Sequence, residues 1–172
     1  MTPLTDFNAI LGHWEAQQPQ ATAISFGNTQ RSWSGLAQRV RRAAAALRAA
    51  GMVPGDRIAV LDLNHPSCLE LTLACAQIGT ANAVVNFRLA PPEIAYVIND
   101  AKARLLFVVP EFAGAVDKLR EHLPSVERFI RIGGDNDEYE AWLAAREPDA
   151  RAYAAAPTDC FVQLYTSGTT GF

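Results

Sequence analysis

Short apolar segments alternate with longer segments of helical pattern through most of the chain, and this alternation limits the folds that it can form. The pattern predicts strands at 58–61, 83–85, 105–109, 129–132 and 161–165, and helices at 66–78, 91–99, 112–123 and 137–146. Consecutive strands joined by helices lie parallel, and the helices cover the faces of the sheet. We therefore predict an α/β fold, a doubly wound and mainly parallel sheet with helices on both faces.

The segment before this alternation has its own signals. Asp6 is a predicted N-cap for a helix over 7–17, and Gly27-Asn28 predicts a hairpin between strands at 22–26 and 29–33. Ser34 is the predicted cap of the next helix, which Gly51 ends. The pattern places four arginines of this helix on a solvated face instead of in a binding patch: Arg39, Arg41, Arg42 and Arg48.

A segment rich in Ala and Pro, 147–158, predicts a surface linker before the last strand. That strand leads into Tyr165-Thr166-Ser167-Gly168-Thr169-Thr170-Gly171-Phe172. Glycine lets a backbone approach an anion closely, and serine and threonine hydroxyls add hydrogen-bond donors. Ligands of parallel sheets bind beyond the carboxyl ends of the strands, which is where this run begins. The run therefore predicts a phosphate-binding loop at 166–172, with a flexible tail as the alternative.

The same run resembles the signature loop of the AMP-forming acyl-adenylate family, which includes acyl-CoA synthetases, adenylation domains and luciferases. In that family the loop continues with Pro-Lys-Gly. Weaker similarities occur in the family's order along the chain, from about Asp6 to Phe172: Arg31-Ser32-Trp33-Ser34-Gly35-Leu36, Gly51 to Val60, and Ala76 to Asn86. A further segment, Asn86-Phe87-Arg88-Leu89, resembles the acyl-CoA synthetase (fatty-acid–CoA ligase) branch more than the adenylation domains of peptide synthetases.

The resemblance implies a two-step reaction. A carboxylate attacks the α-phosphate of ATP to give an acyl-adenylate, and coenzyme A then displaces AMP. By matching positions, Thr166 would lie near Mg²⁺, and five residues would contact the β and γ phosphates of ATP: Ser167, Gly168, Thr169, Thr170 and Gly171. Residues 1–172 would then be an incomplete N-terminal α/β domain that ends inside the loop. The family's catalytic lysine and adenine-binding motifs would lie outside it, so the fragment would contain no catalytic residue and be inactive alone.

The substrate implied by the resemblance is a small carboxylic acid, and the segment at 86–89 favours a fatty acid over an aryl acid. Two alternatives stay open: an adenylation or aryl-CoA ligase of the same family, and a non-catalytic α/β module that binds a partner or an anion. A reading frame that continues with Pro-Lys-Gly would favour the enzyme. A stop codon after Phe172 in several related genes would favour the module.

Composition excludes several other classes. The formal net charge is −3 and the isoelectric point about 5.6, which gives no basic footprint for nucleic acid. Apolar runs are too short to span a membrane, and the first residues lack the pattern of a secretory signal. Cys68, Cys75 and Cys160 have no metal-ligand spacing, and the first two are predicted buried thiols of a reducing, cytoplasmic compartment. An apolar face left exposed in such a fragment would also favour a homodimer.

Several polar residues have a structural and a functional interpretation. His13, His65 and His122 are predicted surface or capping residues instead of metal ligands, and Asn64 or Ser67 is the predicted cap of the helix at 66–78. For Arg88, a structural ion pair is favoured over an anion contact. The acidic residues at 135–140 predict a solvated turn, and the three tryptophans predict packing positions.

Overall fold

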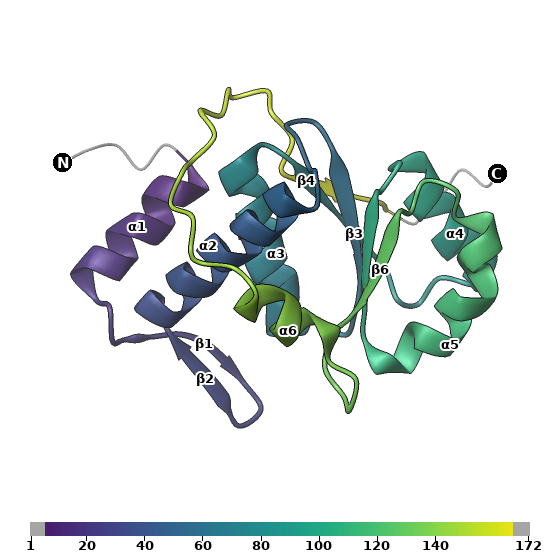
Figure 1. Ribbon diagram of the computed structural model, residues 1–172, viewed down its shortest axis with the longest axis horizontal. Helices are drawn as coiled ribbons and strands as arrows, with labels where there is room; N and C mark the ends of the chain where they lie inside the picture. The colour runs from purple at the N-terminus through teal and green to yellow at the C-terminus, as the bar shows by residue number, and fades with distance from the viewer. Residues whose placement is uncertain (1–5, 167–172) are drawn as a thin grey trace.

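The computed structural model describes residues 6–166, and its centre is a five-stranded parallel sheet (Figure 1). The strands are β3 (Arg57–Leu61), β4 (Ala81–Val85), β5 (Leu105–Val108), β6 (Arg128–Arg131) and β7 (Val162–Leu164). Their order across the sheet is β6-β5-β3-β4-β7, and all neighbours pair in parallel. Each predicted strand is present, with bounds that differ by one or two residues at an end.

Helices cover both faces of this sheet, which confirms the predicted fold class (Figure 1). One face is covered by α2 (Trp33–Ala49), α3 (Pro66–Ile78) and α6 (Glu138–Ala144), and α1 (Phe7–Gln17) packs on α2 and α3. The other packs against α4 (Pro91–Asp100) and α5 (Pro110–Leu119), which continues into the short 3-10 helix η1 (Arg120–His122). Alternate residues of β3 point to opposite faces, with Ile58 and Val60 in one core and Ala59 and Leu61 in the other.

Strands that follow β3 in sequence lie on both sides of it in the sheet. The chain reaches β4 on one side through α3, and then crosses back through α4 to β5 on the other side of β3. Because successive crossovers lie on opposite faces, a crevice forms where the winding direction changes, at the carboxyl ends of the strands. The fold therefore places any ligand-binding loop at this edge.

A small antiparallel hairpin, β1 (Thr22–Phe26) and β2 (Thr29–Ser32), precedes the main sheet and leads directly into α2. The cap of α2 is Ser32, whose hydroxyl accepts a hydrogen bond of 3.1 Å from the backbone N–H of Gly35. The prediction that Ser34 caps this helix was wrong. Ser32 has the extended backbone of an N-cap and lies three residues before Gly35, whereas Ser34 is already inside the first turn.

We call residues 147–158 the strap; this is the segment predicted to be a surface linker. Its side chains are mostly exposed, but its backbone is tied to α3. The side-chain amide of Gln77 donates to the carbonyls of Asp149 (2.6 Å) and Arg151 (3.2 Å), and the Tyr153 N–H donates to the Gln77 carbonyl (2.8 Å). Arg48 adds an ion pair of 2.8 Å with Asp149. The strap therefore follows a fixed path from α6 to β7.

No helix of the described residues, 6–166, is long and apolar enough to cross a membrane.

Candidate functional site

The carboxyl ends of the parallel strands meet at one edge of the sheet, and β7 delivers the predicted phosphate loop there. Tyr165 and Thr166 follow directly after Leu164, the last residue of β7, and Thr166 is exposed. The remaining predicted phosphate contacts, Ser167, Gly168, Thr169, Thr170 and Gly171, lie outside the described residues. The structure thus places the start of the loop at the edge where parallel sheets bind ligands, and the contacts of the loop stay a prediction.

Tyr165 is held by a chain of hydrogen bonds that the sequence did not reveal. Its hydroxyl donates to Asp100 Oδ2 at 2.6 Å and accepts from Gln163 Nε2 at 2.6 Å. The side-chain amide oxygen of Gln163, Oε1, in turn accepts from Arg57 Nε at 2.8 Å. Burial, followed by the bond to Asp100, raises the pKa of Tyr165, so the phenol stays protonated at neutral pH.

The turn from β3 into α3 also lies at this edge. The Asp62 carboxylate accepts from the Asn64 N–H at 3.0 Å, and His65 Nδ1 lies 3.3 Å from the Ser67 N–H as the cap of α3. The predicted caps, Asn64 and Ser67, were therefore wrong, while the capping role foreseen for a histidine is confirmed at His65. Asn64 cannot cap because its φ of 63° is left-handed, whereas an N-cap residue needs extended backbone.

Asp62 is the one buried carboxylate of this turn, and burial raises its pKa against the opposing effect of two backbone N–H groups. Cys68 on the first turn of α3 is partly buried, and burial, with the nearby Asp62 charge, raises its pKa to about 12. Burial raises the pKa of Cys75 to about 12 as well. Both thiols are therefore held in the protonated form at neutral pH.

The turn after β4 contains the segment 86–89 that favoured a fatty acid. The Asn86 side chain accepts from the Arg88 N–H at 3.0 Å, and the Arg88 guanidinium lies over the Phe87 ring, 5.5 Å from its centroid. Phe87 stacks on Phe112 of α5. Among the described residues Arg88 pairs with no carboxylate, so the expected ion pair is replaced by this cation–π contact. The contacts of Asn86, Phe87 and Arg88 therefore stabilise the turn.

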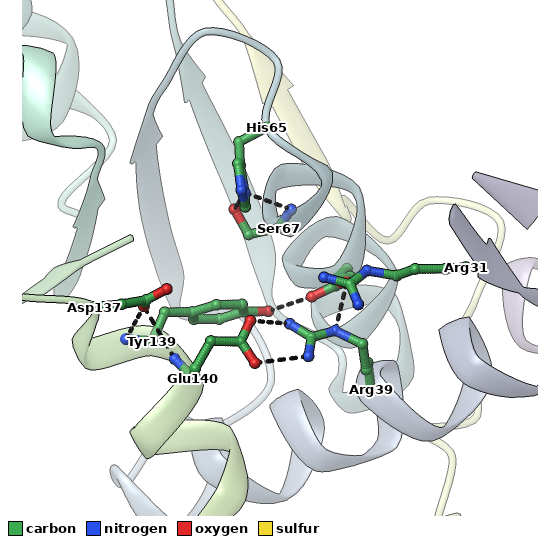
Figure 2. Close-up of polar contacts among 8 residues, drawn as sticks. Arg31, Arg39, His65, Ser67, Asp137, Tyr139 and Glu140 are labelled. Atoms are coloured by element: carbon green, nitrogen blue, oxygen red, sulfur yellow. Dashed lines mark hydrogen bonds and ion pairs between the residues drawn. The ribbon is translucent and has the colours of Figure 1, made fainter. Parts of the chain in front are cut away.

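A buried charge network joins β2, α2, α3 and α6 (Figure 2). Its centre is Glu70, whose side chain is fully buried. Arg31 and Arg39 form ion pairs with it at 3.0 and 2.7 Å, and the Tyr139 hydroxyl donates to it at 3.0 Å. Glu140 accepts two hydrogen bonds from Arg39, of 2.8 and 2.5 Å, as Figure 2 shows.

This network corrects the prediction of a solvated arginine face on α2. Arg39 is engaged as described, Arg41 pairs with Glu15 of α1, and Arg48 pairs with Asp149 of the strap. The acidic turn predicted to be solvated also has structural contacts. Asp137 caps α6, and the Glu138 carboxylate accepts from the Arg131 N–H. Guanidinium groups already matched by carboxylates have little capacity for an anionic ligand, so the network is structural.

No three or more His, Cys, Asp or Glu side chains gather into a possible metal site within residues 6–166. His13 packs edge-on against Trp14, and His122 is exposed. Trp14 stacks on Trp33 with ring centroids 5.8 Å apart, and Trp142 is buried in the core, so the tryptophans occupy packing positions.

Comparison with known proteins identifies the family. Residues 11–172 match the family model of the AMP-binding enzymes. The chain is 36% identical over 168 residues to a feruloyl-CoA synthase of Amycolatopsis, an alignment that covers 95% of this chain and 32% of the relative. It is 35% identical over 137 residues to a long-chain-fatty-acid–CoA ligase of Thermus thermophilus, covering 78% of this chain and 25% of the relative.

A solved structure shows the same fold. An anthranilate CoA ligase in complex with anthranoyl-AMP superposes with a TM-score of 0.90 at 24% identity, over 98% of this chain and 33% of that one. The chain thus spans about a third or less of the length of these proteins. Because the family model covers all but the first residues, the chain belongs to the AMP-binding enzyme family.

Proposed function

We propose that the chain is part of an AMP-forming acyl-CoA ligase, which activates a carboxylic acid with ATP and transfers the acyl group to coenzyme A. One observation carries the proposal: the hydroxyl- and glycine-rich run follows β7 at the carboxyl edge of the sheet, in a chain of the AMP-binding family. That edge is where a parallel sheet binds ligands, and the run is rich in anion-binding groups.

The proposed roles follow the chemistry of the loop. Serine and threonine hydroxyls and backbone N–H groups at 167–171 would donate to the β and γ phosphates, where charge develops as pyrophosphate leaves. Thr166 would present its hydroxyl to Mg²⁺. A hydroxyl is one neutral oxygen ligand, which suits an ion that keeps several waters and takes its other ligands from phosphates. Thr166 is an exposed residue two positions after the end of β7.

The acid is proposed to be a fatty acid first and an aryl acid second. The fatty acid rests on the resemblance of residues 86–89, but Asn86 and Arg88 have local structural contacts that account for them. The aryl acid is supported by the feruloyl-CoA synthase, whose alignment covers more of this chain than that of the fatty-acid ligase. Both acids undergo the same first step.

Carboxylate-dependent exchange of labelled pyrophosphate into ATP tests the function. The complete product of the reading frame that contains this chain is assayed with a panel of fatty and aryl acids. We expect exchange with at least one acid, and the preferred acid identifies the class. Failure with every acid, in a folded protein, would favour the non-catalytic α/β module.

Replacing Thr166 with valine is expected to reduce the exchange rate about tenfold, because one charge-assisted contact near the metal is lost. The Mg²⁺ concentration needed for the half-maximal rate is expected to rise, while the KM for the acid stays unchanged. Thr158→Val is the matched control, since it removes a hydroxyl from an exposed threonine of the strap. Equal rates and equal Mg²⁺ dependence in the two variants would contradict the role of Thr166.

Two further proposals concern the cellular state. All three cysteines are free, which agrees with a reducing, cytoplasmic compartment. The proposed homodimer rests on the expectation of an exposed apolar face; the large exposed apolar side chains of the described residues include Phe26, Leu69 and Leu164, which lie on different elements. The homodimer stays a prediction, and sedimentation at several concentrations measures it.

A further inference from the structure

The strand that leads into the loop is too short to fix the loop by itself. β7 contains three residues, and it pairs in the described part of the chain with β4 alone. Its register partners are Asn82, Ala83 and Val84, so the last backbone pairing lies one residue before Tyr165. Side-chain contacts of Gln163 and Tyr165 must therefore decide the direction in which the chain leaves the sheet.

The hydrogen-bond chain at Tyr165 has one consistent orientation. A guanidinium only donates, so Arg57 Nε must donate to the oxygen of the Gln163 amide, at 2.8 Å. That fixes the Gln163 nitrogen toward the Tyr165 oxygen, at 2.6 Å, where it donates. The single phenolic hydrogen of Tyr165 is then left for Asp100 Oδ2, at 2.6 Å. None of these four side chains can exchange its donor and acceptor roles without losing a hydrogen-bond partner.

The placement of Asp100 supports a specific role. Asp100 is the last residue of α4, where the negative end of the helix dipole disfavours a carboxylate. The Tyr165 ring also packs against the core on the α4 side of the sheet. Ring and hydroxyl are thus held from separate directions, and the residue next to Thr166 is fixed to β3, β7 and α4.

We propose that Asp100, Gln163 and Arg57 are positioning residues, which act through Tyr165 to orient Thr166 and the start of the phosphate loop. The inference rests on the proposed function, because orientation of the loop matters only if the loop binds the phosphates of ATP. Small displacements of such groups are costly, since transition-state contacts depend on geometry.

Tyr165→Phe tests the inference in the complete reading-frame product. The variant keeps the ring in the core and removes both hydrogen bonds of the hydroxyl. We expect the KM for ATP in pyrophosphate exchange to rise about tenfold, with the KM for the acid unchanged and the melting temperature within a few degrees. The matched control is Tyr153→Phe, which removes a phenolic hydroxyl that interacts with Asp159 and lies outside this series of hydrogen bonds. We expect it to leave both KM values unchanged.

Asp100 provides a graded second test. The Asp100→Asn side chain retains an oxygen that can accept from Tyr165, whereas the Asp100→Leu side chain has none. We expect Asn to keep most of the wild-type KM for ATP and Leu to match Tyr165→Phe. If Tyr165→Phe does not fold, this pair decides the question. Equal KM values for ATP in wild type, Tyr165→Phe and Asp100→Leu would overturn the inference.

Hydrogen exchange separates failure of the inference from failure of the proposed function. In the 172-residue chain, we expect the backbone N–H groups of β7 that pair with β4 to exchange about tenfold faster in Tyr165→Phe than in Tyr153→Phe, because the end of the strand loses its anchor. Unchanged exchange there would overturn the inference, whatever the activity. A wild-type protein without pyrophosphate exchange would instead refute the proposed function, and the positioning of Thr166 would then be judged by hydrogen exchange alone.

Discussion

Replacing Glu70 with leucine is expected to lower the free energy of unfolding by about 3–5 kcal/mol, the usual cost of breaking a buried ion pair from one side. The Glu70 side chain is fully buried and receives Arg31, Arg39 and the Tyr139 hydroxyl. Leucine has a similar volume but accepts no hydrogen bond. The Tyr139 hydroxyl would then lie buried without a partner, and both arginines would lose their central carboxylate.

Urea denaturation of the wild type, Glu70→Leu and Glu140→Gln measures the effect. Glu140 pairs with the same Arg39, but its side chain is 49% exposed. We expect Glu140→Gln to cost about 1 kcal/mol or less, because solvent replaces most of what an exposed pair provides. A Glu70→Leu variant as stable as Glu140→Gln would show that the two arginines turn into solvent at little cost.

The fold was predictable because its signals are local. Apolar strands such as 58–61 and 105–109, with helical segments between them, predict a parallel sheet whatever the tertiary partners. The helices predicted at 66–78 and 91–99 agree with the observed α3 and α4 to within one residue. The N-cap residues of the helices depend on less local features. Ser32 and Ser34 are equally suitable residue types, and only the path of the hairpin decides between them.

The partners of charged residues could not be predicted, because they are distant in sequence. Glu140 lies 101 residues from Arg39, and Asp149 lies 101 residues from Arg48. A helical pattern shows that these arginines point away from the core side of α2, but not that α6 and the strap cover them. The predicted solvated face was wrong for that reason.

In the candidate site too, the local feature could be predicted from the sequence and the long-range contacts could not. The position of Thr166 after the last strand follows from the motif and the alternation. The contact that holds Tyr165 could not be predicted, because the Asp100 carboxylate that accepts from its hydroxyl lies 65 residues away in sequence, at the end of α4. One signal was present: Gln163 is a polar residue inside a short apolar strand, and such a residue needs a partner.

Replacing Gly79 with alanine is expected to destabilise the protein by about 2–3 kcal/mol and to detach the strap from α3. Gly79 ends α3 with a φ of 77°, a left-handed conformation that costs alanine about 1 kcal/mol. The remainder comes from a clash, because an added Cβ would lie 2.8 Å from the Tyr153 ring. The ring atoms concerned are next to the Tyr153 backbone, so the strap itself must move. Urea denaturation measures the stability, and limited proteolysis within residues 147–158 measures the release of the strap.

Gly51→Ala separates the clash from the backbone strain. Gly51 follows the end of α2 with a φ of 78°, almost the same as that of Gly79, but an added Cβ meets nothing closer than Arg104 at 3.9 Å. It is therefore expected to lose only about 1 kcal/mol and to leave proteolysis of the strap unchanged. Equal losses in the two variants would mean that Tyr153 moves aside freely. Because the strap leads directly into β7, faster cleavage in Gly79→Ala alone would show that α3 holds the path of the chain toward the loop.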